Sequence, residues 1–330
     1  MMGPIDFVIT WVDDNDPVWK AKKASYDGNK PSEGNTEVRY RDWDTLKYWF
    51  RGVEAFAPWV RYIYFVTDNQ KLSWLNIDHP KLKWVKHEDF IPTEYLPTFN
   101  SVVIEWNFHR IEGLSEHFVY FNDDMFLIRE TTPEDFFVNG LPCDAPKLGL
   151  IHVDDLFART MQNNAELMGR HFTLKEVIKT HWRKWLKIHP LSTVAKLLLY
   201  RRSDKTVGCM NPHIHQSFQK KYFEVLWERE YAQIHQTCLH RLRTAADVTP
   251  YCVREWQLFS GDFYAKKPIG RMFHTASLRY SDEAVEYLKK QKGKAICLND
   301  GEKETDFEQH KQMIIEAFEK ILPKKSSFEK

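Results

Sequence analysis

Acidic and amide side chains gather directly after three strand-like segments of this sequence. They form the groups Asp13-Asp14-Asn15-Asp16, Asp68-Asn69-Gln70 and Asn122-Asp123-Asp124. Ligands of open parallel sheets bind beyond the carboxyl ends of the strands, which is where these groups would meet. Their oxygens suit a hard divalent cation, Mg²⁺ or Mn²⁺, which would in turn neutralise a diphosphate. Each group alone could cap a turn or a helix start, but three groups at equivalent strand ends favour a ligand site.

Glycine loops that cradle phosphate are absent from the sequence. Neither GxGxxG nor GxxxxGK[ST] occurs, which argues against a dinucleotide-binding Rossmann enzyme and against a P-loop NTPase. GxSxG and HExxH are also absent, so serine hydrolase and zincin chemistry have no support. A nucleotide-sugar enzyme that uses a metal ion in place of a glycine loop remains.

Short apolar runs alternate with helical patterns in the first part of the chain. The runs predict strands at residues 7–12, 62–66, 118–121 and, more weakly, 82–85. A helix is predicted at 46–57, where apolar residues recur at helical spacing up to Pro58. Because the strands are apolar almost throughout, the pattern predicts an α/β fold with a mostly parallel, two-sided sheet. A loop rich in Gly, Asn, Ser and Pro is predicted at 28–35.

Residues 155–235 have a mostly helical pattern that includes a basic stripe. Lys175, Lys179, Arg183 and Lys187 repeat at i+4 spacing beside an apolar face. Like charges at that spacing repel one another, so the stripe needs compensation. It is interpreted as a solvated face, as a lid over an anionic substrate or as a patch for a membrane surface. The aromatic residues of this helix, Trp182 and Trp185, are expected to be exposed.

Towards the C-terminus the pattern predicts a strand at 294–298, a charged helix at 307–321 and a frayed tail at 323–330. Four parts are expected along the chain. They are a Rossmann-like half at 1–150 that binds the nucleotide-sugar and the metal, a helical basic insert or lid at 151–205, the remainder of the catalytic domain at 206–300, and a C-terminal helix and tail at 301–330.

The composition excludes several classes of protein. The 47 basic residues nearly cancel the 46 acidic ones, so no overall field favours nonspecific nucleic-acid binding. The five cysteines are widely spaced and form no CxxC pair, which favours buried thiols in a reducing compartment over a disulfide framework or a structural zinc site. No signal peptide is recognisable, and no apolar run approaches the ~18 residues of a membrane span. A soluble or peripheral protein is therefore expected.

Long segments of the sequence resemble the conserved blocks of the Stealth family. The first two blocks are matched by DFVITWVDDNDPVW (6–19), RYRDWDTLKYWFRGVEAFAPWVRYIYFVTDNQ (39–70) and LPTFNSVVIEWNFHRIEGLSEHFVYFNDDMFL (96–127). The third and fourth are matched more weakly by NPHIHQSFQKKYFEVLWE (211–228) and HRLRTAADVTPYCVREWQLFSGDFY (240–264). The family includes bacterial capsular polysaccharide phosphotransferases and the catalytic subunit of the lysosomal-enzyme N-acetylglucosamine-1-phosphotransferase.

The resemblance implies transfer of a hexose or N-acetylhexosamine 1-phosphate from a nucleotide diphosphate sugar, usually UDP-linked. The acceptor would be a hydroxyl of a glycan or lipid-linked glycan in capsular or cell-wall polysaccharide synthesis, and nucleoside monophosphate would leave. A Rossmann-like core akin to the glycosyltransferases of the A type is also implied. For such an enzyme we expect a cytoplasmic location, with peripheral contact at the inner face of the membrane or with the capsule assembly machinery as an alternative.

Matching position by position, the resemblance assigns catalytic roles to Glu105, Asp124, His213 and Arg243. An arginine offers a planar fork for phosphate oxygens, and Arg241 stays an alternative to Arg243. Histidine titrates in the range of a general base towards the acceptor hydroxyl, and Glu105 would orient it or share that role. His213 is preferred to His215 because its distance from Arg243 in the sequence suits the family's spacing, and the choice between them is left open.

The metal and the donor have their own candidate residues. Asp123 and Asp124 are expected to hold Mg²⁺ or Mn²⁺ across the diphosphate. Further contacts of the bound donor are expected from Asp13, Asp16, Arg41 and Asp68. Two alternatives stay open, namely a conventional metal-dependent glycosyltransferase that releases nucleoside diphosphate and an inactive glycan-binding module.

Overall fold

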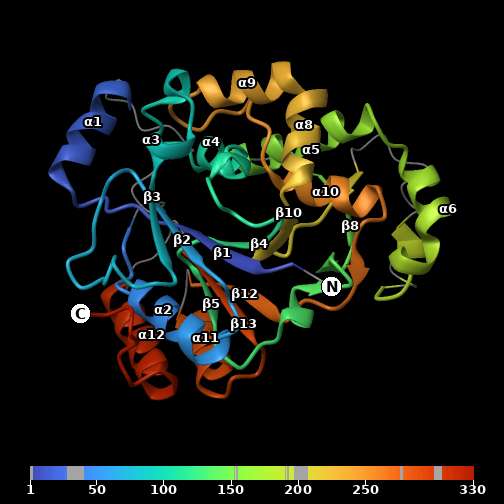
Figure 1. Cartoon of the computed structure of the whole chain (residues 1–330). Coiled ribbons are helices and arrows are strands. Elements are labelled where there is room, and N and C mark those ends of the chain that lie inside the picture. The colour runs from blue at the N-terminus through green and yellow to red at the C-terminus, as the bar shows by residue number, and fades with distance from the viewer. Residues whose placement is uncertain are drawn as a thin grey trace.

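The centre of the molecule is a five-stranded sheet in the order β10-β4-β1-β2-β3 (Figure 1). In a computed structural model, the chain is described for residues 3–27, 41–151, 153, 155–189, 191, 193–196, 207–275, 278–300 and 307–330. The strands of the sheet are β1 (Ile5–Thr10), β2 (Ile63–Thr67), β3 (Leu82–Lys86), β4 (His117–Phe121) and β10 (Gln216–Gln219). Strands β4, β1, β2 and β3 run parallel, and β10 pairs antiparallel with β4. The predicted mostly parallel α/β fold is confirmed.

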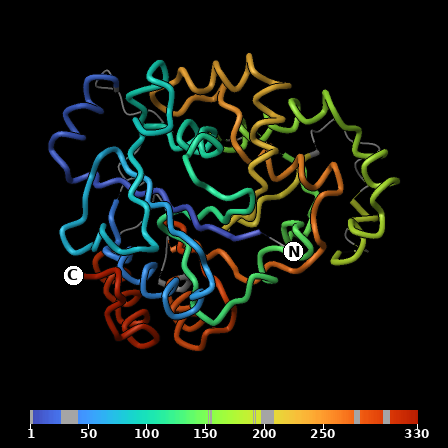
Figure 2. The backbone as a smooth tube through the Cα atoms, viewed as in Figure 1, coloured from blue at the N-terminus to red at the C-terminus, as the bar shows by residue number. Residues whose placement is uncertain are grey.

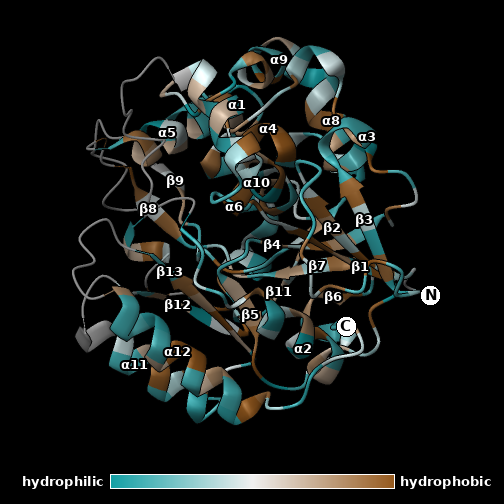
Figure 3. Ribbon diagram, turned by 90° about the vertical axis from the view of Figure 1, so that its left-hand side faces the viewer, coloured by the Kyte–Doolittle hydropathy of each residue, from teal (hydrophilic) through white to brown (hydrophobic). Residues whose placement is uncertain are grey.

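Both faces of this sheet are covered, which explains why its strands are apolar almost throughout. Alternate residues of a strand point to opposite faces, so Phe7 and Ile9 of β1 join one buried cluster whereas Val8 joins another. All three side chains are completely buried. In Figure 3 the strands between the two helical layers carry hydrophobic colour, while hydrophilic and hydrophobic segments alternate along the outer helices.

Helices that lie above the sheet in Figure 1 cover one face. This group includes α4, α8 and α9, with α5, α6 and α10 continuing towards the right of the view. The helices in the upper part of Figure 1 are α1 (Pro17–Asp27), α3 (His87–Phe90), α4 (Ser101–Trp106), α5 (Leu156–Gly169), α6 (Leu174–Trp185), α8 (Lys221–Arg229), α9 (Tyr231–Leu239) and α10 (Tyr251–Phe259). Short 3-10 turns lie at Thr93–Tyr95, Phe108–Arg110 and Pro133–Asp135.

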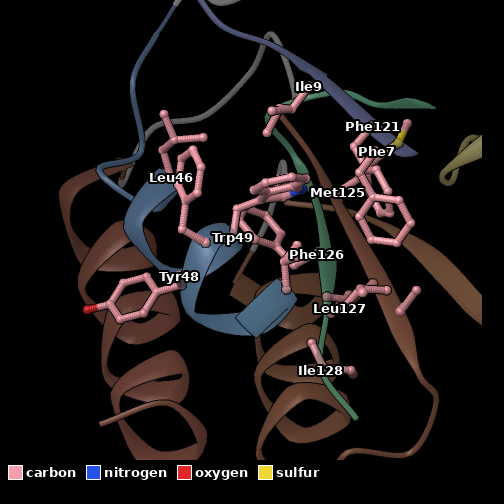
Figure 4. Close-up of a cluster of buried hydrophobic side chains, with 14 of the residues drawn as sticks. Phe7, Ile9, Leu46, Tyr48, Trp49, Phe121, Met125, Phe126, Leu127 and Ile128 are labelled. Carbon is pink, nitrogen blue, oxygen red and sulfur yellow. The ribbon is translucent and has the colours of Figure 1, made fainter. Parts of the chain in front are cut away.

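The opposite face packs on α2 (Leu46–Phe56), α11 (Leu278–Lys289), α12 (Phe307–Ile321) and a second sheet. That sheet has the order β12-β13-β5, with β12 at Gly270–His274, β13 at Ala295–Asn299 and β5 at Met125–Leu127. Figure 4 shows this core, in which Trp49 of α2, Phe121 of β4 and Phe126 of β5 lie together, and the ring centroids of Trp49 and Phe121 are 5.6 Å apart. Smaller pairings join β6 (Phe137–Val138), β7 (Leu141–Asp144) and β11 (Tyr264–Ala265), and β8 (Leu148–Leu150) with β9 (Val207–Cys209).

The connection between the two sheets is a tight turn at residues 122–124. The turn leaves the carboxyl end of β4 and leads directly into β5, which pairs antiparallel with β13. Its backbone is held by a hydrogen bond from Leu298 N to the carbonyl of Asp124 (2.9 Å). The polar groups that follow β4 are therefore fixed by both sheets.

Several expectations from the sequence are confirmed, and others are wrong. The four predicted parallel strands, the helix at α2, the strand at β13 and the helix at α12 are all present. The span 155–235 is not purely helical, because β9 and β10 lie within it and β10 completes the main sheet. The predicted loop at 28–35 lies outside the described residues. The four expected parts of the chain stay a prediction.

Two predictions of exposure are wrong for the same reason, namely burial against a neighbouring element. Trp182 is half exposed as expected, but Trp185 is buried beside Phe259. The tail predicted to fray instead runs beside the segment around residue 50 (Figure 2), and Phe328 is buried against Phe50. Along the described stretches of the chain, no helix combines the length and the apolar character needed to cross a membrane.

The C-terminal segment is held to α2 by a buried ion pair. Arg51 donates to both carboxylate oxygens of Glu329 (2.8 and 3.0 Å) and to the carbonyl of Leu322 (2.9 Å), and the side chains of the Arg51–Glu329 pair are 7% and 6% exposed. Removing one partner of a buried pair leaves an uncompensated charge, which costs about 3 kcal/mol or more. We therefore expect Arg51→Met to lower the free energy of unfolding in urea by roughly that amount.

A matched control removes an exposed pair. Lys290 contacts Glu286 at 2.8 Å with both side chains about half exposed or more, so Lys290→Met should change stability by less than about 1 kcal/mol. Equal effects of the two substitutions would contradict the role assigned to the Arg51–Glu329 pair.

Candidate functional site

A cavity of about 350 Å³ opens at the carboxyl edge of the main sheet, where the second sheet meets it. Four short segments form its walls. They are the residues after β1, the segment before α2, the turn after β4 and the end of β13, which contribute Trp11, Val12, Arg41, Asp42, Trp43, Thr45, Leu46, Asn122, Asp123, Asp124, Phe126, Leu298, Asn299 and Asp300. His213 and Arg243 complete the lining. Among the three polar groups predicted at strand ends, the structure brings only the third into this cavity.

A second cavity of about 140 Å³ adjoins the first and shares part of its wall. Asn122, His213 and Arg243 line both cavities. The second one is also lined by Glu105 of α4, by Leu156 and Phe157 at the start of α5, and by Ser101, Val102, Thr160, Thr244, Asp247, Thr249 and Tyr251. The wall that the cavities share therefore carries a histidine and an arginine that can act on a group bound beside it.

His213 has a backbone conformation that favours glycine. Its φ is 45°, and its backbone N–H donates to the side-chain oxygen of Asn211 (2.7 Å). A non-glycine residue in this region is strained and is retained where the surrounding structure requires it. The ring lies 3.6 Å from Asp124 through Nε2 and 3.3 Å from the Tyr251 hydroxyl through Nδ1. The strained turn thus directs the imidazole towards the wall of the two cavities.

The ionisable groups of the wall change one another's protonation. Burial opposes the charged form of His213, but the contact with Asp124 and the charges of Asp124 and Glu105 outweigh it, so the pKa of His213 is raised. Burial raises the pKa of Glu105 to about 7 against the opposing effects of Arg243, Tyr120, Ser101 and His213. The Tyr120 hydroxyl donates to Glu105 Oε1 (3.2 Å). At neutral pH Glu105 is therefore near half protonation.

Arg243 lies in a loop whose conformation is held by hydrogen bonds to the side chain of Asp247. The buried Asp247 carboxylate accepts hydrogen bonds from Asn100 Nδ2 (2.9 Å), from Thr244 N (3.0 Å) and from Thr244 Oγ1 (2.8 Å), and it contacts His240 at 2.7 Å. From this loop Arg243 Nη2 donates to Ser101 Oγ (2.8 Å). Its Nε is buried and has no hydrogen-bond partner among the described residues. The guanidinium therefore keeps donor capacity for a ligand.

Carboxylates concentrate on the side of the larger cavity. The pKa of Asp123 is raised, first by the loss of hydration among the surrounding groups and then by the negative charges of Asp124 and Asp42. Part of its side chain is nevertheless exposed in the cavity. Asp124 Oδ2 accepts from the Cys297 thiol (3.3 Å), whereas Oδ1 is buried without a hydrogen-bond partner in the described part of the chain. A buried carboxylate oxygen of this kind lacks the partner that it needs. The residues present fit a hard cation bound at Asp123 and Asp124.

The three acids predicted to contact the donor, Asp13, Asp16 and Asp68, form structural contacts outside the cavities. Gln70 Nε2 donates to the Asp13 carbonyl (2.8 Å) and to Asp16 Oδ2 (3.1 Å), so the first two polar groups form one structural clamp. Asp68 pairs with Lys22 at 2.8 Å. The lining of either cavity includes none of the three acids Asp13, Asp16 and Asp68. Arg41 does line the larger cavity, where it binds Asp300 through a bidentate contact (2.7 and 3.0 Å).

The sequence left a choice between His213 and His215 and another between Arg243 and Arg241, and the members of each pair have different surroundings. His215 lies between Phe121 and Phe136 beneath the main sheet, and burial lowers its pKa to about 4. His213 instead lines both cavities. Arg241 donates to the carbonyl of Glu94 (2.9 Å), away from the cavity lining that Arg243 joins.

Sequence reasoning missed several residues of the site. Asp300 follows β13, so the rule that polar groups gather at strand ends could have found it. Tyr251, Phe157 and Cys297 carry no such signal, because only tertiary packing brings the first two to the smaller cavity and the third to Asp124.

The fold and the site together define an α/β protein whose candidate site lies at the carboxyl edge of a mostly parallel sheet, the usual ligand position in such folds. Comparison with known proteins gives the family. Residues 3–31 match the description "Stealth protein CR1, conserved region 1", and residues 39–144 match "Stealth protein CR2, conserved region 2". The chain is 38% identical over 333 residues to the capsular polysaccharide phosphotransferase WcwK of Streptococcus pneumoniae, with 100% of this chain and 99% of that protein covered.

A second relative supports the same assignment. The receptor polysaccharide phosphotransferase WefC of Streptococcus gordonii is 40% identical over 335 residues, with all of both chains covered. Among solved structures, the apo form of the bifunctional glycosyltransferase WbbM has a TM-score of 0.39 and 11% identity, covering 97% of this chain and 52% of that one. On the sequence relationships, the chain belongs to the Stealth family and is a phosphotransferase.

The raised pKa of Glu105 predicts a pH-dependent effect on stability. Because the folded-state pKa of about 7 exceeds the ordinary pKa of 4.5 for this side chain, the protonated carboxyl favours the folded state, and that contribution is lost as pH rises between these two values. We expect the free energy of unfolding of Glu105→Gln, relative to wild type, to increase between pH 4.5 and pH 7 and then to level off. Urea unfolding at a series of pH values measures this difference, and a difference that stays constant would show that Glu105 has an ordinary pKa.

Proposed function

We propose that this enzyme transfers a sugar 1-phosphate from a nucleotide diphosphate sugar, with UDP as the favoured nucleotide, to a hydroxyl of an acceptor glycan in capsular polysaccharide synthesis. The observation that carries the proposal is the shared wall, where Arg243 and His213 face two cavities and Asp124 borders one of them. The names of the relatives, which are capsular and receptor polysaccharide phosphotransferases, support the choice of polysaccharide synthesis. A cytoplasmic location and contact with the membrane or the capsule assembly machinery stay predictions.

The reaction is a displacement at the β-phosphorus of the donor. The acceptor oxygen forms a bond to phosphorus, the anhydride bond to the α-phosphate breaks, and its electron pair leaves with the nucleoside monophosphate. Catalysis of such a step is mostly positioning and electrostatic stabilisation of the oxygens around phosphorus. The Nε of Arg243, which has no hydrogen-bond partner among the described residues, supports a role for this side chain in binding those oxygens.

His213 is assigned the role of general base, which accepts the proton of the acceptor hydroxyl. It can accept that proton only in its neutral form, and Asp124 at 3.6 Å then stabilises the imidazolium that results. Tyr251 contacts Nδ1 and fixes the ring from the other side. Glu105 contributes negative charge near His213 when it is ionised, which favours the same protonated state.

Asp123 and Asp124 are proposed to hold Mg²⁺ or Mn²⁺. When bound, the cation supplies positive charge that neutralises the diphosphate of the donor. The unsatisfied Oδ1 of Asp124 and the other acids of the cavity support this assignment.

The test of the proposal is product analysis with a panel of nucleotide diphosphate sugars, Mg²⁺ and glycan acceptors. We expect nucleoside monophosphate to be released, because the bond that breaks is the anhydride. Release of nucleoside diphosphate would instead indicate a conventional glycosyltransferase, and failure of every donor to react or to raise the melting temperature would indicate a glycan-binding module.

Arg243→Ala should reduce release of the monophosphate by about 10²- to 10³-fold, the usual effect of removing one preorganised donor from a reacting oxyanion. Arg241→Ala is the matched control, since it removes an arginine two residues away that contacts only the Glu94 carbonyl in the structure's hydrogen bonds. The control should keep near-wild-type turnover, with folding of both variants checked by circular dichroism. Equal losses in the two variants would remove the basis for the role of Arg243.

The stereochemistry of the product gives a separate prediction. Since attack occurs at phosphorus, the bond between the anomeric carbon and its oxygen stays intact, and the anomeric configuration of the donor should be retained in the phosphodiester. The coupling constants of the anomeric proton and of phosphorus in NMR spectra of the product measure this. An inverted configuration would show that the sugar–oxygen bond breaks.

A further inference from the structure

We infer that the smaller cavity binds the acceptor sugar and that Phe157 provides the surface on which this sugar stacks. The inference rests on the proposed function and assigns its acceptor side to residues outside the catalytic group. It follows from three features: the wall that the two cavities share, the chemistry of the smaller cavity, and the way in which α5 is fixed to the Arg243 loop.

The direction of the displacement decides which cavity receives which substrate. In phosphoryl transfer the entering and leaving oxygens lie roughly in line on opposite sides of phosphorus. The nucleotide is the larger partner and needs the cavity of about 350 Å³, where carboxylates for its cation are concentrated. With the reacting phosphate at the wall of His213 and Arg243, the entering hydroxyl needs a space next to that wall which the nucleotide does not fill, and the cavity of about 140 Å³ shares this wall.

The lining of the smaller cavity combines an apolar surface with polar groups. Phe157 is 48% exposed and lies outside the buried hydrophobic clusters of the described residues. Its ring meets the edge of Tyr251 at a centroid distance of 6.4 Å, and Tyr251 in turn contacts His213. Sugars present an apolar face and polar edges, for which an exposed aromatic ring next to hydrogen-bonding groups is well suited. Ser101 and Thr244 supply such groups in the same cavity.

Hydrogen bonds of α5 fix the position of Phe157 relative to the loop that carries Arg243. Asp155 caps α5 by accepting from Ala158 N (2.6 Å), which fixes the first turn of the helix. Further along α5, Asn164 exchanges two hydrogen bonds with Thr249 (2.7 and 2.8 Å), and Asn163 donates to the carbonyls of Ala245 and Asp247 (both 2.9 Å). These bonds join α5 to the loop that carries Arg243. A sugar stacked on Phe157 is therefore placed relative to the same loop that binds the phosphate.

The described residues that line the two cavities include none from the basic helix α6. Lys184 of this helix instead donates to the carbonyl of Gly261, and Lys187 beyond it lies over the ring of Tyr264. The exposed aromatic ring that lines the smaller cavity thus comes from α5, whereas the exposed Trp182 of α6 lines neither cavity.

The experiment is steady-state kinetics of the full chain with an active nucleotide-sugar donor, Mg²⁺ and methyl glycosides of glucose, galactose and their N-acetylated forms as acceptors. Phe157→Ala should raise the acceptor KM by about tenfold, the equivalent of one lost aromatic contact, without changing the donor KM. Phe157→Tyr, which keeps the ring, should restore the wild-type acceptor KM. Trp182→Ala is the control for loss of an exposed aromatic residue and should change neither constant.

Three results would overturn the inference. They are a rise in the donor KM with Phe157→Ala, an unchanged acceptor KM in that variant, and wild-type turnover that none of the glycosides increases. Failure of the proposed function has a different signature, because the wild-type enzyme would then release no nucleoside monophosphate from any donor. Circular dichroism and the melting temperature of Phe157→Ala show whether a change in KM reflects unfolding, and the tyrosine variant gives the answer if the alanine variant is unstable.

Discussion

The site depends on how the turn at residues 122–124 is fixed between two sheets. One end of the turn continues β4 of the main sheet, and the other begins β5, whose residue Met125 pairs with Cys297 of β13. The hydrogen bond from Leu298 N holds the Asp124 carbonyl, and the Cys297 thiol donates to its side chain. Because Asn122 lines both cavities and Asp124 faces His213, a shift of this turn would change both cavities at once.

The charges around this turn are only partly compensated within the protein. Arg41 neutralises Asp300 at one side of the larger cavity, but Asp42, Asp123 and Asp124 have no comparable partner among the residues described there. Burial with insufficient positive charge destabilises ionised carboxylates, which is why the pKa values of Asp42, Asp123 and Glu105 are all raised. Such a site is suited to bind a cation and a substrate whose reacting group needs electrostatic stabilisation. Keeping these acids together without compensating charge lowers the stability of the folded state.

The sequence allowed the framework of the fold to be predicted because the parallel strands are long apolar runs. It also placed Asp123, Asp124, His213 and Arg243 together, through strand-end position and family resemblance. The structure does not bring Asp13, Asp16 and Asp68 to the cavities with them, since an acid after a strand can equally serve a structural role, here as a partner of Gln70 or Lys22. β10 escaped prediction because its four residues, Gln216–Gln219, include no β-branched side chain and only one aromatic. The cavity shared by α4, α5 and α10 follows from tertiary packing, for which local patterns carry no signal.

The antiparallel strand β10 also has a consequence for how the chain is made. Its partner β4 ends at Phe121, whereas β10 begins at Gln216, so nearly 100 residues separate two strands that share a ladder. During synthesis from the N-terminus, β4 is the edge of the sheet until β10 has been completed, and an unpaired edge is a template for pairing with other chains. Pairing over such a separation is also slow, because a long loop must close before the ladder forms. The length of chain between the two strands therefore sets the time for which the nascent sheet remains open.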